Sequence, residues 1–141
     1  IDRGIIAVGA EAVGAMEVLY KSTVEYCKTR EQFGQPIGKF QVLQHRMVDM
    51  FMEHEQSKSL LYMAAIKMSS ADVTEKKRSI SALKVQVGKS GRFVGQNAIQ
   101  LHGGMGMTDE LNIGHYFKRL TAIETLFGNV DHHLKKYSNV A

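Results

Sequence analysis

The sequence predicts an all-α protein, an up-down-up-down four-helix bundle with a short extra helix. In three long stretches, apolar residues recur every three or four positions, as they do on the buried face of a helix. Short segments rich in Gly, Pro or Ser separate these stretches, and no segment alternates apolar and polar residues for long enough to predict a strand. Residues 1–141 are expected to form one domain, as a fragment of a longer chain.

The first long helix is expected over residues 4–30. Its apolar positions lie three or four residues apart, and charged residues occupy much of the remaining surface. Gly9 and Gly14 lie inside this helix, where glycine lowers helix stability, so we expect both to mark close crossings with other helices. The helix should end near Arg30, because residues 34–38 contain the only proline of the chain.

The second and third long helices are expected over residues 39–68 and 75–102. Each carries an apolar face at helical spacing. The connection between them contains serines, and Thr74 is the expected N-cap of the third helix. Shorter helices over residues 109–123 and 129–137 should complete the bundle.

Composition and charge narrow the classes of function. The chain has 18 Lys and Arg against 14 Asp and Glu without a long basic run, so a dedicated nucleic-acid surface is not expected. No apolar run approaches the roughly 18 residues that predict a membrane span. Cys27 is the single cysteine, which excludes a disulfide within the chain and suits a reducing, cytoplasmic setting.

The histidines do not predict a metal site. A zinc site needs three or four converging ligands, whereas this sequence offers only small groups of donors. These groups are His45 with Asp49, and Asp131 with His132 and His133. The signatures of nucleophile elbows, zincins and P-loops do not occur, so any chemistry is expected to come from a cofactor.

A glycine cluster follows the third predicted helix directly. Gly103, Gly104 and Gly106 lie within four positions of one another. Glycine permits positive φ and lets a ligand approach the backbone without meeting a Cβ atom. The cluster therefore predicts either a sharp corner between two helices or a seat for a ligand.

A second candidate site follows the first predicted helix. Arg30, Phe33 and Gly34 supply a cation, an aromatic ring and a bend within five residues. This combination suits a phosphate-linked aromatic group. The structural alternative is that Arg30 caps the C-terminus of the helix and that Phe33 plugs the bundle.

Together these stretches resemble the C-terminal helical domain of the acyl-CoA dehydrogenases. The resemblance rests on R-x-x-F-G at residues 30–34, F-Q at residues 40–41 and Q-L-H-G-G-M-G at residues 100–106, and it covers essentially the whole chain. It implies an FAD-dependent oxidoreductase of fatty acid metabolism that removes hydrogen from the α and β carbons of an acyl-CoA thioester. In the family two further domains complete the enzyme, so the isolated domain is expected to be inactive.

The resemblance also implies which residues bind the cofactor. In the family, the R-x-x-F-G stretch and the Gln-Gly-Gly corner grip the adenosine diphosphate half of FAD across a dimer interface. Carried over residue by residue, this role falls on Arg30, Phe33, Gln41, Gln100, Gly103 and Gly104. The implied partners are an acyl-CoA substrate, an electron-acceptor protein, and further subunits in a homo- or hetero-oligomer, either a dimer or a tetramer.

The sequence departs from the family at the catalytic base. One family position for this carboxylate directly precedes a glycine and holds Phe127 here, and the other falls on Gly4. Neither residue can accept a proton from the α carbon. Asp2 and Glu124 are the nearby acidic candidates, although a first-turn acid also complements a helix dipole and Glu124 could pair with a neighbouring basic group.

Three interpretations therefore stay open. The full-length protein could be a competent acyl-CoA dehydrogenase with a displaced base. It could be a non-catalytic subunit of a heteromeric member, similar to the small subunit of pimeloyl-CoA dehydrogenase. The third interpretation is a related flavin-dependent monooxygenase, which needs no base for an α proton.

Overall fold

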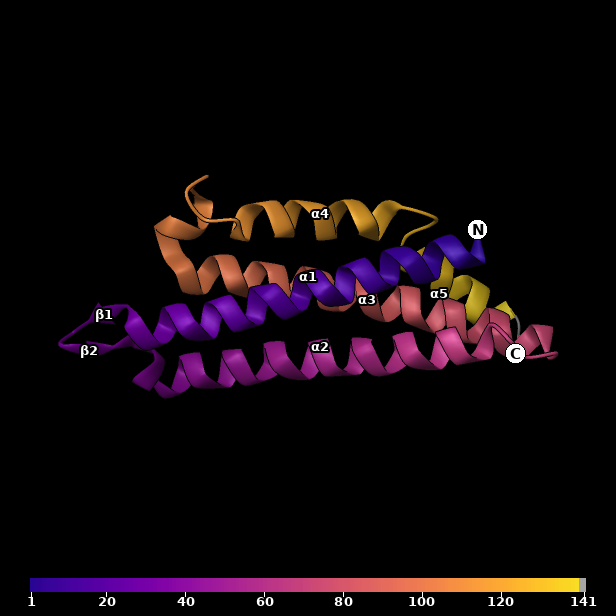
Figure 1. Ribbon diagram of the computed structural model, residues 1–141, viewed down its shortest axis with the longest axis horizontal. Helices are drawn as coiled ribbons and strands as arrows, with labels where there is room; N and C mark the ends of the chain where they lie inside the picture. The colour runs from indigo at the N-terminus through magenta and orange to yellow at the C-terminus, as the bar shows by residue number, and fades with distance from the viewer. Residues whose placement is uncertain (140–141) are drawn as a thin grey trace.

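The computed structural model describes residues 1–139 as an antiparallel helical bundle with one short extra helix (Figure 1). The all-α prediction and the up-down-up-down order of the four main helices are confirmed. The helices are α1 (Asp2–Thr29), α2 (Gln41–Lys67), α3 (Val73–His102), α4 (Ile113–Thr125) and α5 (Val130–Asn139).

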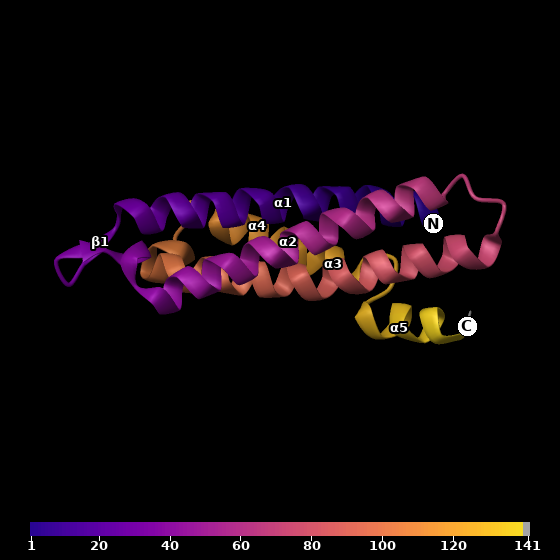
Figure 2. The same cartoon turned by 90° about the horizontal axis from the view of Figure 1, so that it is seen from below.

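Helix α3 lies at the centre of the bundle. It packs against each of the other four helices, and α2 and α4 lie on opposite sides of the α1–α3 pair (Figures 1 and 2). Apolar side chains from α1 to α4 form one core, and burying each large one contributes about 1.5–3 kcal/mol. Its fully buried members include Met16, Leu19, Met50, Leu83, Val94 and Ile123.

A short β-hairpin joins α1 to α2. Strands β1 (Glu31–Gln32) and β2 (Gln35–Pro36) pair antiparallel. Phe33 and Gly34 form the turn, with φ of 55° and 78°. The expectation that the chain contains no strand is wrong here, because strands of two residues are too short to show an alternating pattern.

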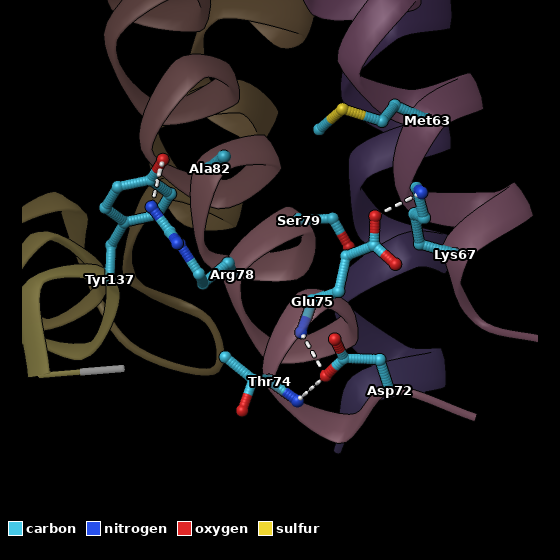
Figure 3. Close-up of a pocket in the computed structure, with 9 residues that line it drawn as sticks. All are labelled: Met63, Lys67, Asp72, Thr74, Glu75, Arg78, Ser79, Ala82 and Tyr137. Atoms are coloured by element: carbon cyan, nitrogen blue, oxygen red, sulfur yellow. Dashed lines mark hydrogen bonds and ion pairs between the residues drawn. The ribbon is translucent and has the colours of Figure 1, made fainter. Parts of the chain in front are cut away.

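The start of α3 corrects one predicted detail. The N-cap is Asp72, whose Oδ1 accepts hydrogen bonds from the N–H groups of Thr74 and Glu75 at 2.8 and 3.1 Å (Figure 3). The prediction that Thr74 is the N-cap is therefore wrong. The carboxylate of Asp72 satisfies N–H groups that the first turn of a helix leaves free.

Two 3₁₀ helices shape the hairpin end of the bundle. They are η1 (Ile37–Lys39), which leads into α2, and η2 (Gly103–Met107), which follows α3. Because η2 and the turn after it occupy the corner, α4 begins at Ile113 rather than near residue 109. Within residues 1–139, no helix combines the length and the apolar character that crossing a membrane requires.

Candidate functional site

A pocket of about 420 Å³ lies at the hairpin end of the bundle. It is formed by the C-terminus of α1, the segment around η1 and the corner that follows α3. Four of the six predicted cofactor residues line it: Arg30, Gln100, Gly103 and Gly104. The fold therefore brings the two sequence stretches together into one site.

Phe33 and Gln41, the other two predicted residues, do not line this pocket. Phe33 is 91% exposed at the tip of the hairpin, with its ring edge-on to that of Phe40 at 6.1 Å. The alternative that Phe33 plugs the bundle is therefore wrong. Gln41 is the exposed first residue of α2, and cofactor contacts of both residues remain predictions.

Arg30 is the C-cap of α1, directly after its last residue Thr29, so the structural alternative that Arg30 caps this helix is confirmed. Its N–H donates to the carbonyl oxygen of Tyr26 at 2.8 Å, and its own carbonyl accepts from the N–H of Ile37 at 2.8 Å. The main chain is thus fixed on both sides while the side chain is exposed. No carboxylate within residues 1–139 forms a salt bridge with Arg30. Its guanidinium is available to an anionic ligand.

The three glycines of the corner differ in the structural constraint that favours glycine at each position. Gly103 ends α3 with a φ of 59°, a conformation that favours glycine. A Cβ on Gly106 would lie 2.9 Å from the carbonyl oxygen of Ile99, so no side chain fits there. Gly104 has neither constraint, and nothing lies within 4 Å of a Cβ built on it. The backbone conformation and close packing of the corner account for Gly103 and Gly106. The space beside Gly104 is open to a ligand.

Tyr26 and His102 also line the pocket. Their rings stack with centroids 4.4 Å apart and an angle of 29° between the planes. Nδ1 of the buried His102 lies 2.8 Å from the carbonyl oxygen of Ala98 and donates to it, which leaves Nε2 as the acceptor in the neutral ring. Burial lowers the pKa of His102. The sequence predicts no role for His102, although its place beside Gly103 is an available signal.

The two family positions for the base, Gly4 and Phe127, lie against each other. Gly4 lies in the first turn of α1, and Phe127 lies in the turn between α4 and α5. A Cβ built on Gly4 would lie 2.9 Å from Cζ of Phe127, so the aromatic ring covers this glycine. Neither position supplies a carboxylate.

The two weaker base candidates lie in ordinary surroundings. Asp2 is exposed in the first turn of α1 and lines a pocket together with Lys77 and Lys136. Oε1 of Glu124 accepts a hydrogen bond from the N–H of Val130 at 3.3 Å, which supports the start of α5. A catalytic role for Asp2 or Glu124 remains a prediction.

Lys84 holds the turn that carries Phe127. Although it is a lysine, its side chain is only 1% exposed. Its Nζ donates to the carbonyl oxygens of Glu124 and Gly128, both at 2.8 Å. Burial lowers the pKa of Lys84, while the nearby charge of Glu124 raises it.

His133 adds a second contact to this turn. Nε2 of the buried imidazole lies 3.0 Å from the carbonyl oxygen of Phe127, and Nδ1 lies 3.4 Å from Oγ of Ser81. Burial is the main cause that lowers the pKa of His133. The sequence predicts no role in this turn for His133 or Lys84. The available signal was the spacing of Lys84, which lies four residues after the apolar Ile80.

A further pocket, of about 390 Å³, lies between the ends of α2 and α3 (Figure 3). Its charged side chains contact other residues of the chain. Lys67 forms a salt bridge with Glu75, and the guanidinium of Arg78 lies 4.9 Å from the ring centroid of Tyr137. In the described part of the chain, no group of three or more His, Cys, Asp or Glu side chains could hold a metal ion.

Comparison with known proteins identifies the family. The model of the acyl-CoA dehydrogenase C-terminal domain matches residues 1–138. The chain belongs to this family. The acyl-CoA dehydrogenase IpdE2 of Mycobacterium tuberculosis is 37% identical over 120 residues, which cover 84% of this chain and 35% of that protein. The chain therefore spans about a third of the length of this relative.

Solved structures share the fold of this chain. The FAD complex of PigA superposes with a TM-score of 0.86 at 29% identity, covering 93% of this chain and 34% of PigA. A variant of the Tcur3481–Tcur3483 steroid ACAD superposes with a TM-score of 0.93 at 27% identity, covering 99% of this chain and 38% of that one. The helical bundle of this chain is thus retained in solved structures that are 27% and 29% identical to it.

Proposed function

We propose that this chain is the C-terminal domain of an FAD-dependent acyl-CoA dehydrogenase, which oxidises a thioester between its α and β carbons. In this proposal the domain binds the adenosine diphosphate half of FAD and supplies part of an oligomer interface, and an electron-acceptor protein reoxidises the enzyme. Family membership supports the reaction class, and the FAD complex of the related PigA supports the cofactor. The single observation that carries the cofactor role is the corner pocket, which is lined both by the exposed Arg30 and by the open backbone at Gly104.

The residues of this pocket suit the parts of such a ligand. The guanidinium of Arg30 can donate charge-assisted hydrogen bonds to a pyrophosphate. At Gly103 and Gly104 the main chain can meet the ligand without an intervening Cβ atom. The side chain of Gln100 adds an amide that can donate or accept. Bound FAD supplies the hydride-accepting chemistry of the reaction.

Replacing Arg30 tests the cofactor role. In the full-length protein, Arg30→Ala should raise the dissociation constant for FAD by about tenfold or more, because a hydrogen bond to a charged group contributes about 1.5–3 kcal/mol. The measurement is the fraction of flavin retained after dilution and desalting. Arg92→Ala, which removes another exposed arginine from α3, is the matched control. Equal flavin retention in the two variants would contradict the assignment.

A second function is favoured by the contact between Gly4 and Phe127. Abstraction of the α proton requires a base. Neither Gly4 nor the ring of Phe127 that lies against it carries a group that can accept a proton. The chain would then belong to a non-catalytic subunit of a heteromeric acyl-CoA dehydrogenase. Its contribution would be cofactor binding and assembly, and a homologous partner subunit would supply the carboxylate.

This second function predicts a poor catalyst. Without a homologous partner, the full-length subunit should oxidise acyl-CoA about 10² to 10⁴ times more slowly than its Phe127→Glu variant, because a positioned general base contributes about that factor. The measurement is dye-coupled oxidation of a series of saturated acyl-CoA thioesters.

Two conservative variants serve as controls for this comparison. Asp2→Asn and Glu124→Gln should leave the slow basal rate of the subunit unchanged. Full activity of the wild-type subunit that disappears in either variant would identify that residue as the base and would contradict a non-catalytic role.

A further inference from the structure

His102 is a buried histidine in which the fold assigns a hydrogen-bond role to only one ring nitrogen. The residue is 5% exposed, and its Nδ1 donates to the carbonyl oxygen of Ala98, one turn earlier in α3. A carbonyl can only accept, so Nδ1 carries the proton of the neutral ring and Nε2 carries a lone pair. Burial lowers the pKa of His102, which favours this neutral form. The contact with Ala98 therefore accounts for Nδ1 but not for Nε2.

Nε2 of His102 is accessible from the corner pocket. Within residues 1–139 it has no hydrogen-bond partner, and the two ring nitrogens of His54 are the only fully buried side-chain polar atoms there that lack one. Nε2 of His102 is thus not enclosed by the protein, and His102 lines the pocket. An apolar side chain could fill this position without a polar atom that needs a partner. The lone pair of Nε2 is an acceptor in the wall of the pocket.

Tyr26 holds the imidazole of His102 in place. The two rings stack with centroids 4.4 Å apart, and the hydroxyl of Tyr26 donates to the main-chain carbonyl oxygen of His102 at 3.5 Å. The carbonyl oxygen of Tyr26 in turn accepts from the N–H of Arg30. Tyr26 therefore links the end of α1, which carries Arg30, to the end of α3, which carries His102.

The polar groups of the pocket differ in what they can bind. The guanidinium of Arg30 only donates hydrogen bonds, whereas Nε2 of the neutral His102 only accepts them. Arg30 is the one Lys or Arg side chain that lines the pocket, and no Asp or Glu lines it. A phosphate oxygen suits Arg30 but has no proton to donate to Nε2. The ligand therefore needs an O–H or N–H group as well as a phosphate, and an adenosine nucleotide has both.

We propose that His102 is a binding residue whose Nε2 accepts a hydrogen bond from the adenosine of FAD while Arg30 binds the pyrophosphate. Tyr26 is a positioning residue that acts through the ring of His102. This inference rests on the proposed function, which supplies the ligand. It gives the dinucleotide a direction in the pocket, with the adenosine at the end of α3 and the pyrophosphate at the end of α1.

The first experiment compares FAD with three analogues by isothermal titration of the full-length protein from which flavin has been removed. Flavin hypoxanthine dinucleotide lacks the amino group of adenine, and two deoxy analogues lack the 2′- or the 3′-hydroxyl of the adenosine ribose. The analogue without the donor that Nε2 uses should bind about three- to tenfold more weakly than FAD, because one neutral hydrogen bond is lost. Equal binding of FAD and all three analogues would overturn the inference, and this comparison needs no variant protein.

A variant then assigns the lost hydrogen bond to Nε2. His102→Phe keeps a ring beside Tyr26 but removes the acceptor, so it should bind FAD about three- to tenfold more weakly than wild type. It should also bind FAD and the discriminated analogue equally, because the two changes remove the same interaction. His54→Phe removes a buried histidine that does not line the pocket, and this matched control should discriminate as wild type does. Discrimination that persists in His102→Phe would assign the hydrogen bond to another residue and overturn the inference.

Two variants of Tyr26 test its positioning role. Tyr26→Phe keeps the stacked ring and should retain the discrimination between FAD and the analogue. Tyr26→Ala removes the ring, so the imidazole loses its support and the discrimination should fall. Undiminished discrimination in Tyr26→Ala would show that Tyr26 does not position His102.

The outcomes separate this inference from the proposed function. If Arg30→Ala and His102→Phe both bind FAD as tightly as wild type, the corner pocket does not bind the cofactor, and both the inference and the proposed cofactor role are wrong. If Arg30→Ala weakens FAD binding and His102→Phe does not, the inference alone is wrong.

Discussion

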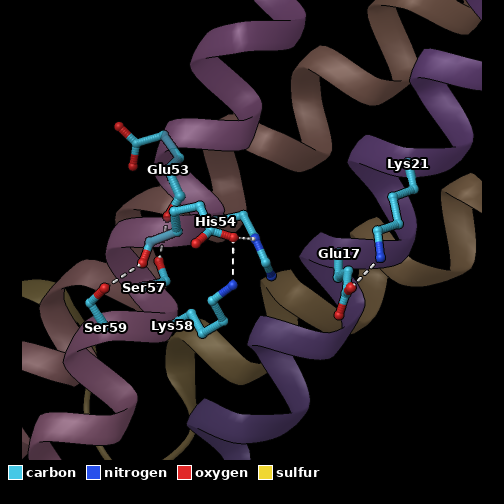
Figure 4. Close-up of polar contacts among 8 residues, drawn as sticks. Glu17, Lys21, Glu53, His54, Ser57, Lys58 and Ser59 are labelled. Carbon is cyan, nitrogen blue, oxygen red and sulfur yellow. Dashed lines mark hydrogen bonds and ion pairs between the residues drawn. The ribbon is translucent and has the colours of Figure 1, made fainter.

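His54 is a buried residue whose polar atoms the fold does not satisfy (Figure 4). It is 1% exposed and lies against the ring of Tyr20, with centroids 5.1 Å apart. Oε1 of Glu55 lies 3.2 Å from Nδ1, within reach of an ion pair when the ring is protonated. Within residues 1–139, neither ring nitrogen forms a hydrogen bond. Burial is the main cause that lowers the pKa of His54. Glu55 and Glu17 raise it, and Lys58 lowers it further.

This environment predicts how stability depends on pH. Because the pKa is lower in the folded state, folding favours the neutral ring. The stability it contributes is present above about pH 6.5, the value of an unfolded histidine, and is lost as pH falls through the folded pKa. His54→Phe removes two unsatisfied atoms, so it should raise the free energy of unfolding by about 1 kcal/mol at pH 7.5 and weaken its fall towards pH 5.

Urea denaturation at the two pH values checks this prediction. His45→Phe, at an exposed position of the same helix, is the matched control and should leave the pH dependence unchanged. An acid-induced loss of stability that is equal in His54→Phe and wild type would show that another group titrates.

Single residues also mark the limit of sequence-based prediction at the two sites. Arg30 and Gly104 could be found because a motif contains them, and the fold places both at one pocket. Lys84 has only a weak signal, its helical spacing from Ile80, because lysine is almost always exposed. The fold is needed to show that its ammonium group donates to two main-chain carbonyl oxygens. The ring of Phe127 on Gly4 is a contact between residues far apart in sequence, which no local pattern reveals.

At the scale of helices, the apolar periodicity predicted each long element to within a few residues, but not which glycines mark crossings. Gly9 does, since a Cβ there would lie 3.1 Å from Leu83. Gly14 does not, because nothing lies within 4 Å of its Cβ position. The tightest crossing is between α3 and α4, where a Cβ on Gly95 would lie 2.4 Å from the ring of Phe117. The sequence shows which helices contain glycine. Whether a glycine marks a close crossing depends on the side chain that the neighbouring helix places against it.

A pair of alanine substitutions tests this distinction. Gly95→Ala should lower the free energy of unfolding by about 1–3 kcal/mol, because the added methyl overpacks the α3–α4 contact. Gly14→Ala should raise it by about 0.5–1 kcal/mol, because alanine stabilises an unobstructed helix interior. Thermal or urea unfolding gives both values. Effects of the same sign would contradict the assigned crossings.

At the scale of the whole molecule, α2 leaves much apolar surface uncovered. Seven of its apolar side chains are exposed, and a large exposed apolar surface is typical of an interface. The exposed apolar residues of α2 are Val42, Val48, Phe51, Met52, Tyr62, Met63 and Ile66.

We expect the domain to self-associate through this face. Sedimentation velocity at high micromolar concentration should show dimers or larger species, and the charge introduced by Phe51→Lys should shift them towards monomer. Ile1→Lys changes an equally apolar, exposed residue outside α2 and should have no such effect. A monomer at all concentrations would contradict the expectation.

The length of α1 sets the distance between the two candidate sites. Gly4 lies in its first turn and Arg30 at its end, and a helix of 28 residues is about 42 Å long. A single dinucleotide that is bound at Arg30 does not extend to Phe127 of the same chain. In the proposed assembly, the corner and the base position of one chain would then serve different active sites. Two defective alleles, one altered at Arg30 and one in the turn that carries Phe127, would complement each other, because mixed oligomers would contain some sites built from two intact halves.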